Sequence, residues 1–426
     1  MKNDFAKIQR EIDAMQPELV RIRRDLHRFP ETGWLEMRTT AILAKALRAM
    51  GYETYTGRAV CREGARLGLP DEAALAAHAE RALAQGAPKD ELTQDVRAGY
   101  TGVVAVLRCG EGATLAMRFD IDALPMAECP QETHRPTREG FASVNPGMMH
   151  ACGHDGHMAM LLGLAHAWEA VRDSLPHNLL LIFQPAEETT GGAADICSQG
   201  VLDEYRVSRI FGCHLWPGLP EGQAFARPGP MMARSSEVTL TIRGRSVHIA
   251  NRQQGNDALL AGAEFLRAAY AFMDAGFPPA EPRVLGFGRM ESGQVRNALS
   301  DHTRLEGTLR VFNDQVFAQA QQGLQALAEE TAAQQGCQAA LAFSPGYPPL
   351  LNDPALVALA GDLLSPLPAP SMTTDDFSFF AQARPSLFFF LGVGEQAAPL
   401  HNPAFDFNEA VLSRGLDIFL ALARLP

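Results

Sequence analysis

The stretch HACGHDGH, at residues 150–157, places three histidines, a cysteine and an aspartate within eight positions. These side chains bind divalent metals, but a cysteine nucleophile beside a base, or the polar start of a helix, uses the same residue types. We expect Cys152 and His154 to be ligands that share one loop, with His150 and His157 capping or supporting them. The stretch alone supplies too few ligands to settle the chemistry.

Further potential ligands occur at three distant places, each at or just beyond a predicted strand. Glu187 and Glu188 follow NLLLIFQ (178–184), His214 lies in RIFGCHL (209–215), and His401 follows SLFFFLGVG (386–394). In open α/β sheets, ligands bind at the carboxyl ends of the strands, so we expect these positions to converge. A set of cysteine, histidine and carboxylate ligands suits a borderline divalent ion such as zinc or manganese.

The adjacent pair Glu187–Glu188 indicates hydrolysis. Neighbouring carboxylates point in different directions, so one can bind a metal while the other approaches an activated water. A metal lowers the pKa of its water from 15.7 toward about 7, and a free carboxylate can then take and relay the proton. Two other classes stay open: a cysteine hydrolase, which would leave both glutamates and His401 without roles, and a binding protein without activity.

The order of apolar runs favours an α/β fold with a mainly parallel sheet. Between residues 235 and 343 the pattern changes to strand, helix, two strands, helix and strand, which is typical of a ferredoxin-like α+β unit. We therefore expect a catalytic domain of residues 1–234 and 344–426, with 235–343 inserted. An alanine-rich, charged segment at 61–99 predicts a helical insertion that either decorates the surface or shapes the substrate mouth.

The composition excludes several partners. A net charge of −12 argues against nucleic acid or an anionic membrane. No apolar run approaches the ~18 residues of a membrane span, and the charged N-terminus lacks a signal core. Seven cysteines without a framework spacing suit a reducing compartment, so we expect a cytoplasmic protein.

Six motifs resemble, in the same order, those of a known enzyme family. They are RDLHRFPETGWLE, MRFDIDALP, GMMHACGHDGHMAMLLG, IFQPAEE, HLWP and LHNPAFDF. Over nearly its whole length the chain resembles the aminoacylase/carboxypeptidase-type dinuclear metallopeptidases. It is most similar to their amidohydrolase branch, which includes indole-acetyl-amino-acid, hippurate and aminobenzoyl-glutamate hydrolases. The 61–99 insertion and HRPTREGFAS most resemble the A-subunit type of the aminobenzoyl-glutamate hydrolases.

The resemblance implies a role for individual residues. The implied ligands of one or two Mn²⁺ or Zn²⁺ ions are Cys152, His154, Glu188, His214 and His401. Glu187 would be the general base and acid, whereas the resemblance does not assign Asp120 or Asp122 as metal ligands. The inserted domain would be the lid and dimerisation domain, in a homodimer or a heteromer with a paralogous subunit. Its His248 would polarise the scissile carbonyl, often from the neighbouring subunit, and Asn297 and Arg310 would bind the substrate carboxylate.

The activity implied by the resemblance is hydrolysis of an aryl-amide or of an N-acyl or N-aroyl amino acid, so the substrate would be a small aromatic carboxylate. Three motifs near the substrate depart from the family pattern: VHIANRQQGND, RNALSDH and DDFS. Because the metal motifs are intact and these are not, the alternative is hydrolytic removal of an amine from an electron-poor aromatic acid at the same site.

Overall fold

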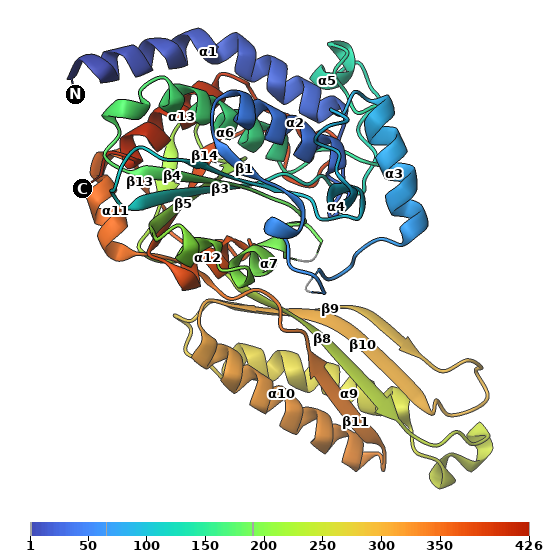
Figure 1. Ribbon diagram of the computed structural model, residues 1–426. Coiled ribbons are helices and arrows are strands. Elements are labelled where there is room, and N and C mark those ends of the chain that lie inside the picture. Colours follow the sequence, from blue (N-terminus) through green and yellow to red (C-terminus); the bar gives the residue numbers. More distant parts are fainter. Residues whose placement is uncertain (1, 65, 190, 426) are drawn as a thin grey trace. The chain divides into compact units, whose positions relative to one another are not determined.

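The computed structural model describes residues 2–64, 66–189 and 191–425 (Figure 1). Internal packing divides the chain into two compact units. The main unit comprises Met1–Gly229, Leu351–Pro368 and Phe379–Pro426, and the inserted unit comprises Pro230–Leu350 and Ala369–Ser378. Two short strands, β7 (Gly229–Met232) and β12 (Leu350–Asn352), lie where the chain passes from one unit to the other.

The main unit is built on an eight-stranded sheet with the order β1-β2-β4-β3-β5-β14-β6-β13. The strands are β1 (Glu53–Tyr55), β2 (Val103–Leu107), β3 (Thr114–Asp120), β4 (Asn178–Gln184), β5 (Val207–Trp216), β6 (Ala224–Ala226), β13 (Ser365–Pro366) and β14 (Ser386–Gly392). The four central strands β4, β3, β5 and β14 run parallel, and antiparallel pairs flank them. The predicted α/β class with a mainly parallel sheet is confirmed.

Helices cover the sheet and explain why its central strands are apolar throughout. On one face lie α1 (Lys2–Arg28), α6 (His154–Glu169) and α13 (Val411–Leu422), which pack on one another (Figure 1). Every residue of β3 and β14 is buried, as expected for parallel strands covered on both faces. The other helices of this unit include α2 (Met37–Ala49), α5 (Arg135–Arg138), α7 (Gly192–Ser198), α8 (Val201–Glu204), α11 (Pro354–Ala360) and α12 (Phe377–Ala383, which begins in the inserted unit).

The segment 61–99 is helical only in part. It contains α3 (Glu72–Ala84) and the single turn α4 (Gln94–Arg97), and the chain turns between them. The break follows from Gly86, whose φ is +89°, and from Pro88 shortly after it. Apolar residues of α3 pack against α2 in a small core of their own. The insertion is therefore packed firmly on the main unit.

The inserted unit has four antiparallel strands in the order β11-β8-β10-β9. Its elements are β8 (Arg234–Arg243), α9 (Ala258–Ala275), β9 (Arg283–Ser292), β10 (His302–Val311), α10 (Asp314–Gln334) and β11 (Gln338–Phe343). Asp257 and Asn313 cap the two helices, whose apolar faces pack on the sheet. This connectivity is the predicted ferredoxin-like arrangement. Across both units, no helix in the described residues is long and apolar enough to cross a membrane.

Candidate metal centre

The candidate ligands meet where parallel strands of the main unit end. Strand β3 ends at Asp120, β4 ends at Gln184, and β5 carries His214 two residues before its end. The carboxyl ends of parallel strands share one edge of the sheet, so loops far apart in the sequence lie together there. The candidate ligands that were predicted to converge lie at this edge of the sheet.

His154 is the first residue of α6, not a loop residue as the sequence suggested. Gly153 precedes it with φ +88°, a left-handed conformation that suits glycine and turns the chain into the helix. The buried imidazole donates from Nδ1 to the carbonyl of Asp122 at 2.8 Å. Its Nε2 has no hydrogen-bond partner and lies 3.8 Å from Glu188 Oε1. This unpaired, buried nitrogen is the atom that a metal would bind.

His214 is held in the same tautomer. Its Nδ1 donates to the carbonyl of Leu215 at 2.7 Å, which leaves the lone pair on Nε2. That Nε2 lies 3.3 Å from Sγ of Cys152. A metal-binding histidine typically has its other ring nitrogen fixed by a carbonyl or carboxylate, and both His154 and His214 meet this condition.

Glu188 and His401 lie on loops with unusual backbone conformations. Glu188 donates its N–H to Asp122 Oδ2 at 2.9 Å, and its Oε1 lies 3.2 Å from His401 Nε2. His401 has φ +58° and donates its N–H to the carbonyl of Ala151 at 2.9 Å, while its side chain is half exposed. A left-handed conformation in a residue other than glycine costs free energy and is concentrated at functional sites.

Three overlapping groups bring all five proposed ligands and Glu187 together. In each group the potential ligand atoms lie within 4.8 Å of one another: Cys152, His154 and His214; Cys152, Glu188 and His401; His154, Glu187 and Glu188. Thiol, imidazole and carboxylate donors are the set that zinc and manganese accept. The donor chemistry and the unpaired Nε2 of His154 therefore fit a divalent cation.

The electrostatics of the cluster also favour a cation. Burial raises the pKa of the Cys152 thiol well above its usual range, and the carboxylates of Glu188 and Glu187 raise it further. Burial lowers the pKa of His154, but Asp120 and Asp122 outweigh it and raise that pKa to about 10. Burial lowers the pKa of His214 well below its usual value. A bound divalent cation would offset the concentrated negative charge.

A supporting layer lies behind the ligands. Burial lowers the pKa of His157, and its Nε2 accepts the N–H of Leu215 at 3.0 Å, so its proton lies on Nδ1, which donates to Asp120 at 2.6 Å. Asp120 also accepts from the buried guanidinium of Arg118 at 3.1 Å. This role of Arg118 was not predicted from the sequence. An arginine inside an otherwise apolar strand is the signal that would have pointed to it.

His150 is buried, and neither of its ring nitrogens has a hydrogen-bond partner. Burial lowers its pKa to about 3. None of the potential metal-binding groups found in the described residues includes it.

Three residues of the inserted unit were predicted to act on the substrate, His248 on its carbonyl and Asn297 and Arg310 on its carboxylate, and one chain brings only the first two together. The N–H of Ile249, next to His248, donates to the carbonyl of Asn297 at 2.9 Å, so His248 and Asn297 are neighbours. Arg310 pairs with Ser235 on the sheet, whereas His302, close to Asn297, pairs with Arg243. The eight residues from His302 to Arg310 span about 26 Å at about 3.3 Å per residue. Arg310 therefore lies far from Asn297 and His248.

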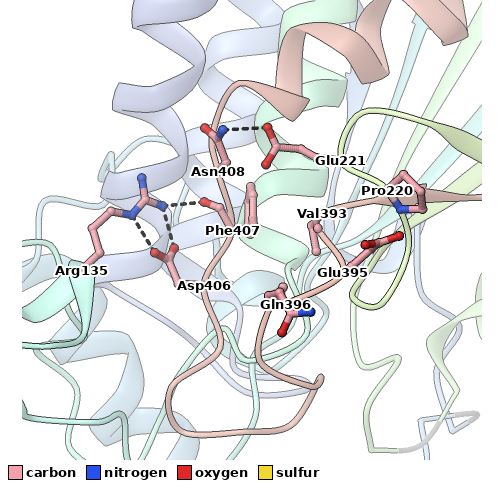
Figure 2. Close-up of a pocket in the computed structure, with 11 residues that line it drawn as sticks. Arg135, Pro220, Glu221, Val393, Glu395, Gln396, Asp406, Phe407 and Asn408 are labelled. Atoms are coloured by element: carbon pink, nitrogen blue, oxygen red, sulfur yellow. Dashed lines mark hydrogen bonds and ion pairs between the residues drawn. The ribbon is translucent and has the colours of Figure 1, made fainter.

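A cavity of about 800 Å³ on the main unit is not this centre (Figure 2). None of the proposed site residues lines it. Several of its polar side chains bond one another: Arg135 donates to Asp406, and Asn408 donates to Glu221. We interpret it as a surface hollow beside the loop that carries His401.

An α/β fold with a buried Cys-His-Glu cluster at the ends of its parallel strands defines a candidate metallohydrolase. The chain belongs to peptidase family M20/M25/M40, whose family model matches residues 116–425. It is 37% identical to the A-subunit of p-aminobenzoyl-glutamate hydrolase from Escherichia coli, over 94% of each chain. It is 36% identical to indole-3-acetyl-aspartic acid hydrolase of Enterobacter agglomerans, over 97% of each chain.

A solved structure supports the same assignment. The chain superposes on a dinuclear metal-binding peptidase of the M20 family from Bacillus subtilis with a TM-score of 0.75 and 27% identity, covering 96% of this chain and 98% of that one. The family resemblance inferred from the motifs is confirmed, and the protein is a hydrolase. The neighbour and the ligand cluster together support a divalent-metal centre.

Proposed function

We propose that the protein is a metal-dependent amidohydrolase that cleaves the amide bond of N-acyl or N-aroyl amino acids. The observation that carries the proposal is the convergence of Cys152, His154, Glu188, His214 and His401 with a further carboxylate, Glu187. The two relatives named above are, by their names, hydrolases of p-aminobenzoyl-glutamate and of indole-3-acetyl-aspartic acid. An aromatic acyl group and an amino-acid carboxylate are therefore the proposed substrate features.

The proposed cofactor is one or two Mn²⁺ or Zn²⁺ ions held by those five side chains. When bound, a divalent ion polarises the carbonyl and activates water for attack. Glu187 is the proposed general base and acid because it adjoins the ligand cluster, is 9% exposed and is not itself a proposed ligand. It would accept a proton from the attacking water and deliver it to the leaving amine, as a single carboxylate can do in turn.

The inserted unit is proposed to supply His248, Asn297 and Arg310 to the substrate. Arginine suits a carboxylate because its planar fork donates two parallel hydrogen bonds, and a histidine N–H can stabilise the developing oxyanion. Because His248 follows the end of β8 at Arg243 whereas Arg310 pairs near its start, with Ser235, we propose that a site that uses both draws on two copies of the unit. We therefore propose a homodimer or a heteromer with a paralogue.

Two other features belong to the proposal. The segment 61–99, packed on α2 beside the loop at 31–36, is proposed to border the substrate entrance. All seven cysteines lie in the described residues and none forms a disulfide there, and we propose a cytoplasmic location.

The test is hydrolysis of a substrate panel before chelation, after chelation and after return of Mn²⁺ or Zn²⁺. The panel contains aryl-amides of glutamate, aspartate and glycine, matched amides without a carboxylate, and amino-substituted, electron-poor aromatic acids. We expect metal-dependent cleavage of the carboxylate-bearing amides. Cleavage of the aromatic amines alone would move the function to deamination, which the altered motifs around His248 and Asn297 keep open. No turnover on any member, with metal bound, would favour a binding protein.

A further inference from the structure

Glu36 is a fully buried carboxyl group that holds the loop carrying the two glutamates of the metal centre. Its Oε1 accepts the N–H of Ala186 at 2.8 Å, and its Oε2 accepts the hydroxyl of Thr101 at 2.6 Å. No ion pair of Glu36 is found in the part of the chain that the structure describes. Burying a carboxyl group without a cation costs free energy, and the two hydrogen bonds offset part of that cost. This arrangement indicates that Glu36 contributes to the fold or to the site.

The residue that Glu36 holds has an unusual conformation. Ala186, which immediately precedes Glu187, has φ +54°, a backbone conformation that residues other than glycine rarely adopt. Such a conformation persists only where the surroundings enforce it. The N–H of Glu188 is held by Asp122 at 2.9 Å, so the loop is clamped on both sides of Glu187.

The segment around Glu36 also packs against this loop without space to spare. A Cβ added to Gly33 would lie 3.2 Å from Ala186 Cα and 2.2 Å from Thr189 Oγ1. On its other side, the same segment pairs with the chain after Asp122, because the carbonyl of Glu31 accepts the N–H of Ala123 at 2.8 Å.

We propose that Glu36 is a positioning residue: it fixes Ala186 so that the neighbouring carboxylates of Glu187 and Glu188 point to different places in the metal centre. The expected effect on turnover rests on the proposed function. The expected effects on the conformation of the loop and on the metal affinity of the protein do not.

The nature of the interaction identifies the informative variants. Burial raises the pKa of Glu36 well above its usual value, and Asp122 raises it further. A neutral glutamine at this position keeps an acceptor oxygen for Ala186 and offers an N–H to Thr101. Aspartate keeps the carboxyl but withdraws its oxygens by one methylene, and alanine removes them. Tyr52→Phe is the control, because it deletes another buried hydrogen bond of the main unit, to Ala165.

The experiment measures three properties of Glu36→Ala, Glu36→Asp, Glu36→Gln and Tyr52→Phe. They are the dissociation constant for Zn²⁺ and Mn²⁺ in competition with a chelator, hydrogen exchange of the amides at 183–189, and kcat at saturating metal. We expect the alanine and aspartate variants to bind metal about 10–100-fold more weakly and to exchange faster, as for other residues that orient ligands. The glutamine variant should stay within about threefold of wild type, and Tyr52→Phe should lose only thermal stability.

Wild-type metal affinity and exchange in Glu36→Asp would overturn the proposal, and so would equal losses in Glu36→Gln and Glu36→Ala. The aspartate variant keeps the test decisive if the alanine variant does not fold. If the wild-type protein hydrolyses no amide, the proposed function fails, yet metal affinity and exchange still decide the role of Glu36.

Discussion

His157 donates from Nδ1 to Asp120 at 2.6 Å and accepts the N–H of Leu215 on Nε2. Both ring nitrogens are therefore occupied by the protein, although His157 stands only three residues after a proposed ligand. The same oxygen of Asp120 lies 3.6 Å from Nε2 of His154. His157 thus orients the carboxylate of Asp120 beside the ligand cluster, and neither residue is a proposed ligand.

The first prediction concerns this pair. His157→Ala should lower the affinity for Zn²⁺ or Mn²⁺ by about 10–100-fold, because Asp120 loses the donor that orients it. The affinity is measured by competition with a chelator. His166→Ala, on the exposed face of the same helix, is the control and should bind like wild type. Unchanged affinity in His157→Ala would show that Asp120 is held well enough by Arg118 alone.

The second prediction concerns a proposed ligand. His401→Ala should lose metal and activity together, and by more than the roughly 10–100-fold expected for a supporting residue. Metal content is measured by elemental analysis after dialysis, and activity on an aryl-amide of glutamate. Full metal occupancy in this variant would remove His401 from the ligand set.

The third prediction separates proton transfer from metal binding. Glu187→Gln should keep its metal and its thermal stability but lose about 10²–10⁴ in kcat, the usual worth of a general base. Steady-state kinetics at saturating Mn²⁺ or Zn²⁺ measure the loss. A decrease of less than about tenfold would mean that another group moves the proton.

The sequence was sufficient for features that depend on periodicity and on the ends of elements. Apolar runs such as 178–184 predicted the central strands, because a parallel strand buried on both faces has few polar positions. The convergence of the proposed ligands was expected from the rule that parallel strands end at one edge. The ferredoxin-like unit followed from the order of its elements.

The sequence was insufficient where a residue acts through a long-range contact. Nothing local to Glu36 indicates that it bonds Ala186, which is 150 residues away. The left-handed conformations of Ala186 and His401 are equally hidden, since neither is glycine. His154 was expected in a loop ahead of a helix at 158–168, but Gly153 starts the helix at His154 by its left-handed backbone conformation.

The fourth prediction concerns a buried charge network behind α6. Arg23 is fully buried and donates to Asp155 at 2.7 Å and to Asp406 at 2.9 Å. Arg23→Met should lower the free energy of unfolding by about 3–5 kcal/mol, because the fully buried carboxylate of Asp155 loses its guanidinium partner. Arg21→Met, on the exposed side of α1, is the matched control. Denaturant unfolding of both variants measures the difference.

His27 makes the stability of this network depend on pH. Burial lowers the pKa of His27, but hydrogen bonds to Asp155 and Glu128 outweigh it, and the net shift is upward. A histidine with a raised pKa stabilises the folded state fully below its unfolded value of about 6.5, and this contribution is lost as the pH rises through the folded pKa. The free energy of unfolding should therefore fall as the pH rises above about 6.5, and His27→Gln should flatten that slope. Equal slopes in both proteins would contradict this assignment.

The fifth prediction concerns Arg310 and His248, which lie at opposite ends of the inserted unit. Arg310→Ala should weaken turnover of carboxylate-bearing amides and leave amides without a carboxylate unchanged, because a guanidinium fork recognises a carboxylate specifically. His248→Ala should slow both kinds of substrate, because the oxyanion forms in each. Indifference of Arg310→Ala across the panel would leave that residue a structural role, since its Nη1 already donates to the carbonyl of Met372 at 2.7 Å.

The same two variants test whether one site draws on two copies of the chain. Consider a homodimer whose sites each take Arg310 from one copy and His248 from the other. A hybrid dimer then contains one Arg310→Ala chain and one His248→Ala chain, and one of its two sites keeps both residues. Equal mixing after subunit exchange should then restore about one quarter of wild-type activity, because about half of the dimers are hybrids. Mixing either variant with the double variant should restore none, which controls for exchange itself. If the first mixture also stays inactive while subunit exchange is demonstrated by differential tagging, each site draws both residues from one copy, and the proposed sharing is wrong.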